Sequence, residues 1–375
     1  MSVKIAINTR LLLPGKLEGI GWFTYQTFKR IALNHPEIEF HFIFDRKYDD
    51  QFIFSDNIKP VVLFPQARHP FLFYWFFEHS LPAYLKRIKP AMFVSPDGLL
   101  SLAWKGCQIP VIHDLNFLHH PEYLPLLASK YYGWRFPKFA KIARRIATVS
   151  EFSKQDIVKA FSYPANKVDV VYNGANEVFK PISPQQAIQT RVEFTGGWPY
   201  FVFVGSLHKR KNIENMLLAF DNFKTKDDKN HKLVIIGEHM FGTRELDRAL
   251  QGMKHKDDVI FVGRLYNEQL SRVVASAEAL LLVSFFEGFG IPIIEAMNCD
   301  VPAITSNVTS MPEVAGNAAL LVDPHSIDSI SHAMARIVNE KNLRQSLIEN
   351  GKQTRQKFSW DQTAERMWNS MQQCL

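Results

Sequence analysis

The sequence predicts an α/β protein of two domains, each a doubly wound parallel sheet, whose ligand-binding edges face a cleft. At 375 residues the chain is long for one hydrophobic core and suits two. Short apolar runs alternate with helical stretches along the chain, which is the order of strand, crossover helix and parallel strand. The runs are continuously apolar, as in strands that are buried on both faces of a sheet.

Seven strands are expected in the first half of the chain. Each is an apolar run that ends in polar or glycine residues. The runs are residues 3–10, 38–45, 58–64, 91–97, 109–115, 144–150 and 168–174. Ligands of doubly wound sheets bind outside the carboxyl ends of the strands, so the residues that follow these runs are candidates for a binding site.

Residues 175–199 contain three prolines and two adjacent glycines and are expected to connect the two domains. Six further strands follow, at residues 200–206, 231–238, 258–264, 278–284, 301–307 and 318–324. We therefore place the first domain at residues 1–180 and the second at 181–357. Apolar residues at helical spacing predict an amphipathic helix over residues 358–375.

Composition and charge exclude several classes of protein. The formal net charge of +7 and the sequence pI of about 9.1 favour anionic partners such as phosphates or acidic lipids. Cys107, Cys299 and Cys374 are odd in number and far apart in sequence, which argues against a disulfide framework and a cysteine metal site. Without a signal-peptide core or a run of ~20 apolar residues, we expect a cytoplasmic protein, peripheral at most to the inner face of a membrane.

The stretch EGFGIPIIEA, residues 287–296, carries the clearest chemical signal. Pro292 suits the start of a helix, which places Glu287 in a loop and Glu295 in the first helical turn. Glycines let the backbone approach a ligand, helix N-termini attract phosphate, and carboxylates accept hydrogen bonds from hydroxyls. A nucleotide sugar fits this combination. The alternative is that Glu287 is solvent-exposed and Glu295 only complements the helix dipole.

A second candidate loop, GSLHKRKN, follows the first strand of the second half at residues 205–212. Arg210 and Lys211 at its end could neutralise charge on a departing diphosphate. The alternative is a solvated basic loop.

Two features of the first half also stand at carboxyl ends of predicted strands. His113 and Asp114 follow one strand, where side chains point into the ligand crevice, although a lone histidine is most often structural. Gly19 and Gly21 lie in the loop after the first strand, ahead of a helix, where they form either a phosphate-facing loop or a simple tight turn.

Several segments together resemble the family 4 retaining glycosyltransferases, which have two Rossmann-like domains in the arrangement called GT-B. SFFEGFGIPIIEAM with CDVPAITSNVTSMPEVAGNAALLVDP is similar to the signature region of that family. VIHDLNFLHHPE, ATVSEFSKQDI, FVGSLHKRKN and FSWDQTAERM resemble it elsewhere, over most of the chain. The resemblance implies that the N-terminal domain holds the acceptor, that the C-terminal domain binds the donor, and that the helix at 358–375 packs back on the N-terminal domain.

The resemblance also assigns roles to residues of this sequence. The catalytic residues that it implies are His113, Arg210, Lys211 and Glu287, with Gly19 and Asp114 as acceptor-side or auxiliary residues. The donor-binding residues that it implies are Gly21, Gly205, Ser206, Gly288, Phe289, Gly290, Ile291 and Glu295. Glu287 contacts the donor sugar in this scheme and Glu295 holds the ribose. Ser206 stands where many family members carry an arginine, and Asp300 where many carry a glycine.

The implied activity is transfer of a sugar from a nucleotide diphosphate sugar to a hydroxyl acceptor, with retention and without metal or cofactor. The acceptor class is a glycan or lipid-linked saccharide of the cell envelope, as in polysaccharide biosynthesis. The alternatives are an epimerase, a phosphorylase with a pyridoxal cofactor, and an inactive sugar-nucleotide binder.

Two segments bear on which partners the protein binds. They are an aromatic cluster at residues 71–80 and a basic, aromatic segment at residues 129–146. The basic residues of the second segment are Lys130, Arg135, Lys138, Lys141, Arg144 and Arg145. They predict either a helix that lies on an anionic membrane surface or a core helix with a solvated basic face. No nucleic-acid recognition motif is present, and we expect no nucleic-acid partner.

Overall fold

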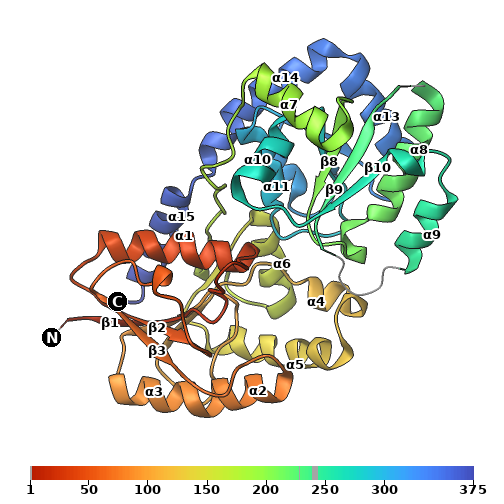
Figure 1. Ribbon diagram of the computed structural model, residues 1–375. Coiled ribbons are helices and arrows are strands. Elements are labelled where there is room, and N and C mark those ends of the chain that lie inside the picture. The colour runs from red at the N-terminus through yellow and green to blue at the C-terminus, as the bar shows by residue number, and fades with distance from the viewer. Residues whose placement is uncertain (1, 228, 239–243) are drawn as a thin grey trace. The chain divides into compact units, whose positions relative to one another are not determined.

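The computed structural model describes residues 2–227, 229–238 and 244–375 (Figure 1). The chain forms two compact units, Met1–Asn173 with Trp360–Leu375 (unit 1) and Gly174–Ser359 (unit 2). From the sequence we expected the domain boundaries after residues 180 and 357, whereas the two units divide after Asn173 and Ser359. Each unit contains a parallel sheet with helices, so the predicted α/β class with two doubly wound domains is confirmed.

Unit 1 has a five-stranded parallel sheet of order β3-β2-β1-β4-β5. Its strands are β1 Lys4–Asn8, β2 Glu39–Phe44, β3 Ile58–Val62, β4 Met92–Ser95 and β5 Cys107–Pro110. Its helices are α1 Gly19–Asn34, α2 Pro70–Trp75, α3 Leu81–Ile88, α4 Asn116–His119, α5 Leu126–Ile142, α6 Glu151–Phe161 and α15 Trp360–Gln372. The strand order reverses between β1 and β4, so the loops after these strands flank the ligand crevice of the sheet.

The last two strands of the first half form a small sheet of their own. β6, Ile146–Thr148, pairs only with β7, Val168–Val170, among the described strands. A parallel bridge between Val111 and Ala147 links this pair to the chain that leaves β5. The prediction of strands here is confirmed, but they do not continue the main sheet.

Unit 2 has a six-stranded parallel sheet of order β10-β9-β8-β11-β12-β13. Its strands are β8 Tyr200–Val204, β9 Lys232–Ile236, β10 Val259–Gly263, β11 Ala279–Leu282, β12 Ala303–Ser306 and β13 Ala319–Val322. Its helices are α7 Pro184–Thr195, α8 Ile213–Asp227, α9 Arg244–Gly252, α10 Asn267–Ala275, α11 Ile291–Asn298, α12 Met311–Ala315, α13 Ile327–Asn339 and α14 Lys341–Thr354. The order reverses between β8 and β11, whose loops are the two that carry Lys211 and Glu287.

The segment expected to connect the domains contains α7 and belongs to unit 2. Ser183 and Gln186 form a reciprocal capping box at its start, and Pro184 occupies the first turn. Gly196 ends the helix at φ 66°, a conformation that glycine adopts without strain. The prolines and glycines therefore mark the two ends of a helix rather than an irregular linker.

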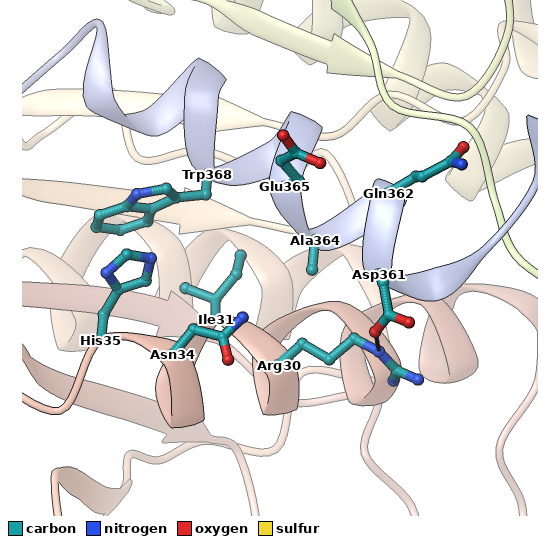
Figure 2. A pocket seen from close by; sticks show the side chains of 9 residues that line it. All are labelled: Arg30, Ile31, Asn34, His35, Asp361, Gln362, Ala364, Glu365 and Trp368. Carbon is teal, nitrogen blue, oxygen red and sulfur yellow. Dashed lines mark hydrogen bonds and ion pairs between the residues drawn. The ribbon is translucent and has the colours of Figure 1, made fainter.

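Helix α15 packs against α1 within unit 1 (Figure 2). Arg30 Nε donates to Asp361 Oδ1 at 2.6 Å, and the His35 and Trp368 rings stack with centroids 3.8 Å apart. A surface pocket of about 340 Å³ lies between these side chains. Met367 and Met371 are fully buried, so the apolar face predicted for this segment is confirmed.

The three cysteines of the chain are divided between the two units. Cys107 begins β5 and Cys374 follows α15, both in unit 1, and Cys299 follows α11 in unit 2. All three cysteines are free.

Candidate active site

Glu287 lies buried between two cations at the carboxyl edge of the unit 2 sheet. Arg210 Nη1 donates to Glu287 Oε2 at 2.6 Å, and Lys211 Nζ donates to Oε1 at 2.6 Å. Ser284 Oγ donates to Oε1 at 2.7 Å. Burial alone would raise the pKa of Glu287, but Arg210 and Lys211 outweigh it and lower the pKa to about 2. The alternative of a solvent-exposed Glu287 is wrong, since its exposed fraction is 6%.

The loop after β8 is fastened to the end of β11, which explains why the two cations reach Glu287. Asn212 has φ 57° and donates from Nδ2 to the Val283 carbonyl at 2.9 Å and the Pro324 carbonyl at 2.7 Å. The Phe285 N–H donates to the Arg210 carbonyl at 2.9 Å. Asn212 therefore positions this loop, a role that we did not predict. The sequence feature that could have indicated this role is an asparagine next to a basic pair at the end of a strand.

The turn Gly288–Ile291 leads from Glu287 into α11. Gly290 has φ 98°, a backbone conformation that favours glycine, and a Cβ there would lie 3.1 Å from Ile293 Cδ1, so that side chain would have to shift slightly. Ser310 Oγ donates to the Glu287 and Phe289 carbonyls at 2.8 and 3.2 Å. The Phe289 ring is buried against Phe358, so only its backbone can serve a ligand at this turn.

Glu295 lies in the second turn of α11, not the first as predicted, because the helix begins at Ile291 and Pro292 is its second residue. Its carboxyl group is partly buried and forms no hydrogen bond or ion pair within the described part of the chain. Desolvation raises the pKa of Glu295 to about 8. A partly buried carboxyl group without a partner is suited to accept hydrogen bonds from ligand hydroxyls.

Gly205 and Ser206 follow β8 directly. Gly205 has φ 153° and its N–H donates to the Ile236 carbonyl at 3.0 Å. A Cβ on Gly237 would lie 1.8 Å from the Gly205 carbonyl oxygen. The segments that follow β8 and β9 therefore pass so close to each other that position 237 has no room for a side chain. Ser206 is half-buried. The structure thus places both residues at the switch point of unit 2.

His113 stands beyond β5 at the carboxyl edge of the unit 1 sheet. Its Nε2 lies 2.9 Å from the Pro96 carbonyl oxygen, which can only accept, so Nε2 carries the proton and Nδ1 is an acceptor. The Phe23 ring packs edge-on with centroids 5.2 Å apart. Desolvation lowers the pKa of His113, so the ring is neutral at pH 7.

The other unit 1 candidates have local structural roles. Asp114 Oδ1 accepts from the Asn116 N–H at 2.9 Å and starts α4. Gly19 and Gly21 lie within α1, not in the loop before it as predicted. A Cβ on Gly21 would lie 3.0 Å from the Leu11 carbonyl oxygen, whereas one on Gly19 would meet nothing within 4 Å. Gly21 therefore permits close contact between α1 and the loop after β1.

An ion pair that we did not predict fixes the β1–β4 switch point. Arg10 Nε donates to Asp97 Oδ2 at 2.5 Å, and Asn8 Nδ2 donates to Oδ1 at 2.9 Å. The Leu99 N–H donates to the same Oδ1 at 3.1 Å, which closes the turn that carries the Pro96 carbonyl. Asp97 therefore positions the acceptor for His113. Its place at the end of a predicted strand was the available signal.

Replacing Asp97 with alanine is expected to lower the free energy of unfolding by about 3–5 kcal/mol, because Arg10 would remain buried without its counter-charge. Urea unfolding of purified protein measures the change. Asp56→Ala, on the half-exposed turn before β3, is the control and should cost much less. Equal stability of the Asp97 variant and wild type would contradict a stabilising role for this pair.

Comparison with known sequences follows the same division of the chain. A family model described as Glycosyltransferase Family 4 matches residues 32–178, and one described as Glycosyl transferases group 1 matches residues 185–354. The chain is 29% identical over 254 residues to the O-antigen chain mannosyltransferase B of Escherichia coli. That alignment covers 68% of this chain and 67% of the relative.

Solved structures share the whole fold. Sucrose-phosphate synthase from Thermosynechococcus elongatus matches with a TM-score of 0.79 and 18% identity over 99% of this chain and 98% of its own. Anabaena Alr3699/HepE, in complex with UDP-glucose, matches with a TM-score of 0.76 and 14% identity over 99% of both chains. The architecture is GT-B, and the two family models together span most of the sequence. The chain belongs to the family 4 glycosyltransferases of the glycosyl transferases group 1.

Proposed function

We propose that this protein transfers a sugar from a nucleotide diphosphate sugar to a hydroxyl group of a cell-envelope glycan or lipid-linked saccharide. Transfer retains the anomeric configuration and needs no metal ion. The observation that carries the proposal is the buried Glu287 between Arg210 and Lys211 at the β8–β11 switch point. The O-antigen mannosyltransferase relative supports the envelope acceptor, and the UDP-glucose complex of a protein with this fold supports the donor class.

Unit 2 holds the donor in this proposal. The diphosphate lies beside Lys211, Arg210 and the turn at 288–291, where cations and backbone N–H groups stabilise charge as the leaving group departs. Glu287, kept ionised by both cations, accepts a hydrogen bond from a sugar hydroxyl. Glu295 accepts hydrogen bonds from the ribose hydroxyls.

Unit 1 supplies the acceptor side. His113, neutral and with Nδ1 as a hydrogen-bond acceptor, is the catalytic residue that this unit supplies. The reacting atom is the anomeric carbon of the donor sugar. The acceptor oxygen bonds to that carbon on the face from which the phosphate oxygen leaves, and the departing phosphate takes the hydroxyl proton. The products are a glycoside and a nucleoside diphosphate, and no protein nucleophile is used.

Turnover assays with GDP-mannose and UDP-glucose, with octyl α-mannoside as the acceptor, test this function. We expect a glycoside with the donor's anomeric configuration by NMR, formed equally in EDTA. Isomerised sugar without acceptor use would indicate an epimerase, and sugar 1-phosphate formed from inorganic phosphate would indicate a phosphorylase. Tight nucleotide binding with no turnover of any donor would indicate an inactive binder.

The raised pKa of Glu295 gives the donor site a distinctive pH dependence. Ribose hydroxyls that donate to the carboxylate favour its charged form, so nucleotide binding should release the proton held below pH 8. Affinity for nucleoside diphosphate is expected to rise with pH between 6 and 8, by up to about tenfold per unit. Calorimetry in buffers of different ionisation enthalpy measures the released proton.

Glu295→Gln is the matched control for this prediction, since it keeps the shape and removes the proton. The affinity of this variant for nucleoside diphosphate should change with pH only because the phosphate groups of the ligand titrate. The pKa of Glu295 is raised in the folded state, so the neutral form stabilises the fold below pH 4.5, and this contribution is lost as pH rises through 8. Ligand-free Glu295→Gln protein should therefore melt above wild type at pH 9. Identical pH profiles would refute the assignment.

An apolar surface on unit 1, formed by α2 and α5, supports an anionic membrane as a partner. Phe71 and Trp75 of α2 are 74% and 57% exposed, and Trp134 of α5 is 55% exposed. The Phe73 and Tyr131 rings contact each other across the two helices at 5.8 Å. Lys138 Nζ lies 3.6 Å from the Trp134 ring centroid, which places a cation among the aromatic side chains. Exposed aromatics with lysines fit the interface of an acidic bilayer.

The structure corrects which basic residues belong to this surface. Arg135 is buried and ion-paired with Glu78. Helix α5 ends at Ile142, so Arg144 and Arg145 lie beyond it, and Arg145 pairs with Asp169. Lys130 and Lys141 are exposed on the helix, and Lys138 is partly exposed. No helix among the described residues combines the length and apolarity that crossing a bilayer requires.

Sedimentation with phosphatidylglycerol-containing vesicles tests this surface. We expect salt-sensitive binding that phosphatidylcholine vesicles do not support and that the double substitution F71S/W75S reduces more than fivefold. Trp198→Ser is the control, because Trp198 is 45% exposed on unit 2. Equal losses in both variants, or no preference for anionic lipid, would count against the assignment.

A further inference from the structure

The loop after β12, residues 306–310, holds the backbone of Glu287. Thr309 Oγ1 accepts from the Glu287 N–H at 3.3 Å. Ser310 Oγ donates to the Glu287 carbonyl at 2.8 Å. Two consecutive side chains of one loop therefore bind both backbone groups of a single residue, and we call these two bonds the backbone clamp.

The backbone conformation of Thr309 makes the clamp possible. Thr309 has φ 58°, in the left-handed region that β-branched residues rarely adopt. In an extended chain, consecutive side chains point to opposite sides. The left-handed turn at Thr309 instead lets its hydroxyl and that of Ser310 reach the same residue. Strained conformations of this kind persist only where the surrounding structure holds them, and they cluster at functional sites.

Ser310 is used against the ordinary preference of its position. It is the N-cap of α12, where a serine side chain normally accepts from an N–H of the first helical turn. Within α12, all of which the structure describes, no N–H donates to this side chain. Its hydroxyl donates instead to the carbonyls of Glu287 and Phe289. Ser310 and the adjacent Met311 are fully buried, so the packed core of unit 2 fixes this end of the clamp.

The clamp differs from the ion pairs of the Glu287 side chain in how it responds to a ligand. The carboxylate is bonded to Arg210 and Lys211. In the proposed function these two cations also neutralise the diphosphate, so they interact less strongly with the carboxylate once the donor is bound. The bonds from Thr309 and Ser310 go to uncharged backbone groups, whose hydrogen bonds depend little on the charge of the ligand. The clamp can therefore keep Glu287 in place in the loaded site.

We propose that Thr309 and Ser310 are positioning residues for sugar transfer and that they act through Glu287. This role rests on the proposed function, in which the Glu287 carboxylate accepts a hydrogen bond from the donor sugar. A misplacement of about 1 Å at a reacting centre can cost about 10²-fold in rate. Loss of the clamp should therefore lower kcat, whereas a nucleoside diphosphate, which Arg210 and Lys211 attract, should bind as before.

Two variants that each lack one hydroxyl test this role. Thr309→Val keeps the branched shape of the side chain, and Ser310→Ala removes a single oxygen atom. With GDP-mannose and UDP-glucose as donors and octyl α-mannoside as the acceptor, we expect each variant to lower kcat at least about tenfold. The Kd of GDP or UDP, measured by calorimetry, should stay within about twofold of the wild-type value. Thr309→Ser keeps the hydroxyl and should retain at least about half of the wild-type kcat.

Ser271→Ala is the matched control for Ser310→Ala. Ser271 of α10 is 4% exposed, and its Oγ donates to the Val178 carbonyl at 2.6 Å. The control therefore also removes a buried hydroxyl that binds a carbonyl of a distant segment. The two variants should lower the Tm by similar amounts, but only Ser310→Ala should lower kcat. This comparison separates the loss of a buried hydrogen bond from the loss of the clamp.

Failure of this role and failure of the proposed function give different results. No transfer by wild type with either donor would refute the proposed function, and the positioning role with it. Transfer by wild type with an undiminished kcat in both Thr309→Val and Ser310→Ala would overturn the positioning role alone. So would an equal loss of kcat in Ser271→Ala, a loss in Thr309→Ser as large as in Thr309→Val, or a parallel loss of kcat and nucleotide affinity.

Discussion

Replacement of Lys211 by methionine is expected to lower kcat for sugar transfer by about 10²–10³-fold, the cost of one preorganised charge donor at a developing anion. Lys211 Nζ is held 2.6 Å from Glu287 Oε1, and its exposed fraction is only 9%. Methionine keeps the apolar stem and removes the cation, so packing is largely preserved. Steady-state kinetics with a saturating donor isolate kcat from binding.

Lys209 provides the matched control for this substitution. It lies two residues earlier in the same loop and is exposed, so Lys209→Met should change kcat less than about twofold. Comparable losses in the two variants would show that the loop matters only through its overall charge. An unchanged kcat in Lys211→Met would remove the residue from the proposed chemistry.

Replacement of Glu287 by glutamine is expected to reduce kcat by about 10²–10⁴-fold, while the Kd of nucleoside diphosphate stays the same or falls. Glutamine fills the space and can still accept from Ser284, but it removes the negative charge between Arg210 and Lys211. A more positive pocket favours the diphosphate, whereas the sugar loses its ionised acceptor. Calorimetry and kinetics on the same preparation separate the two effects.

The surface variant Glu349→Gln serves as the control for Glu287, since Glu349 lies exposed on α14 beside Lys352. It should leave both kcat and Kd unchanged. Parallel loss of turnover and nucleotide affinity in Glu287→Gln would contradict a role directed at the sugar and would indicate loss of the folded site.

Strand positions were predictable because buried parallel strands are continuously apolar and end where polar residues begin. The same rule located Glu287, Arg210 and Lys211, since the carboxyl ends of β8 and β11 meet where the strand order reverses. The pairing itself was not predictable, because it depends on Asn212 fastening one loop to the other.

The errors have physical causes of their own. The sequence analysis grouped Arg135 with the basic residues of a helix face. In the structure its side chain is buried in an ion pair with Glu78, a residue that is distant in sequence. The Arg10–Asp97 pair is likewise a contact between distant segments.

The central claim is that unit 2 binds a nucleoside diphosphate at the Glu287 and Glu295 site. Melting temperatures of wild type and Glu295→Gln, measured at pH 8 against GDP, UDP, ADP and TDP without metal, test it most directly. A ligand at 100 times its Kd should stabilise the fold by about 2.7 kcal/mol. We predict selective stabilisation of wild type by one nucleotide and a smaller shift for the variant. Equal shifts in both proteins, or none with any nucleotide in folded wild type, would contradict the claim.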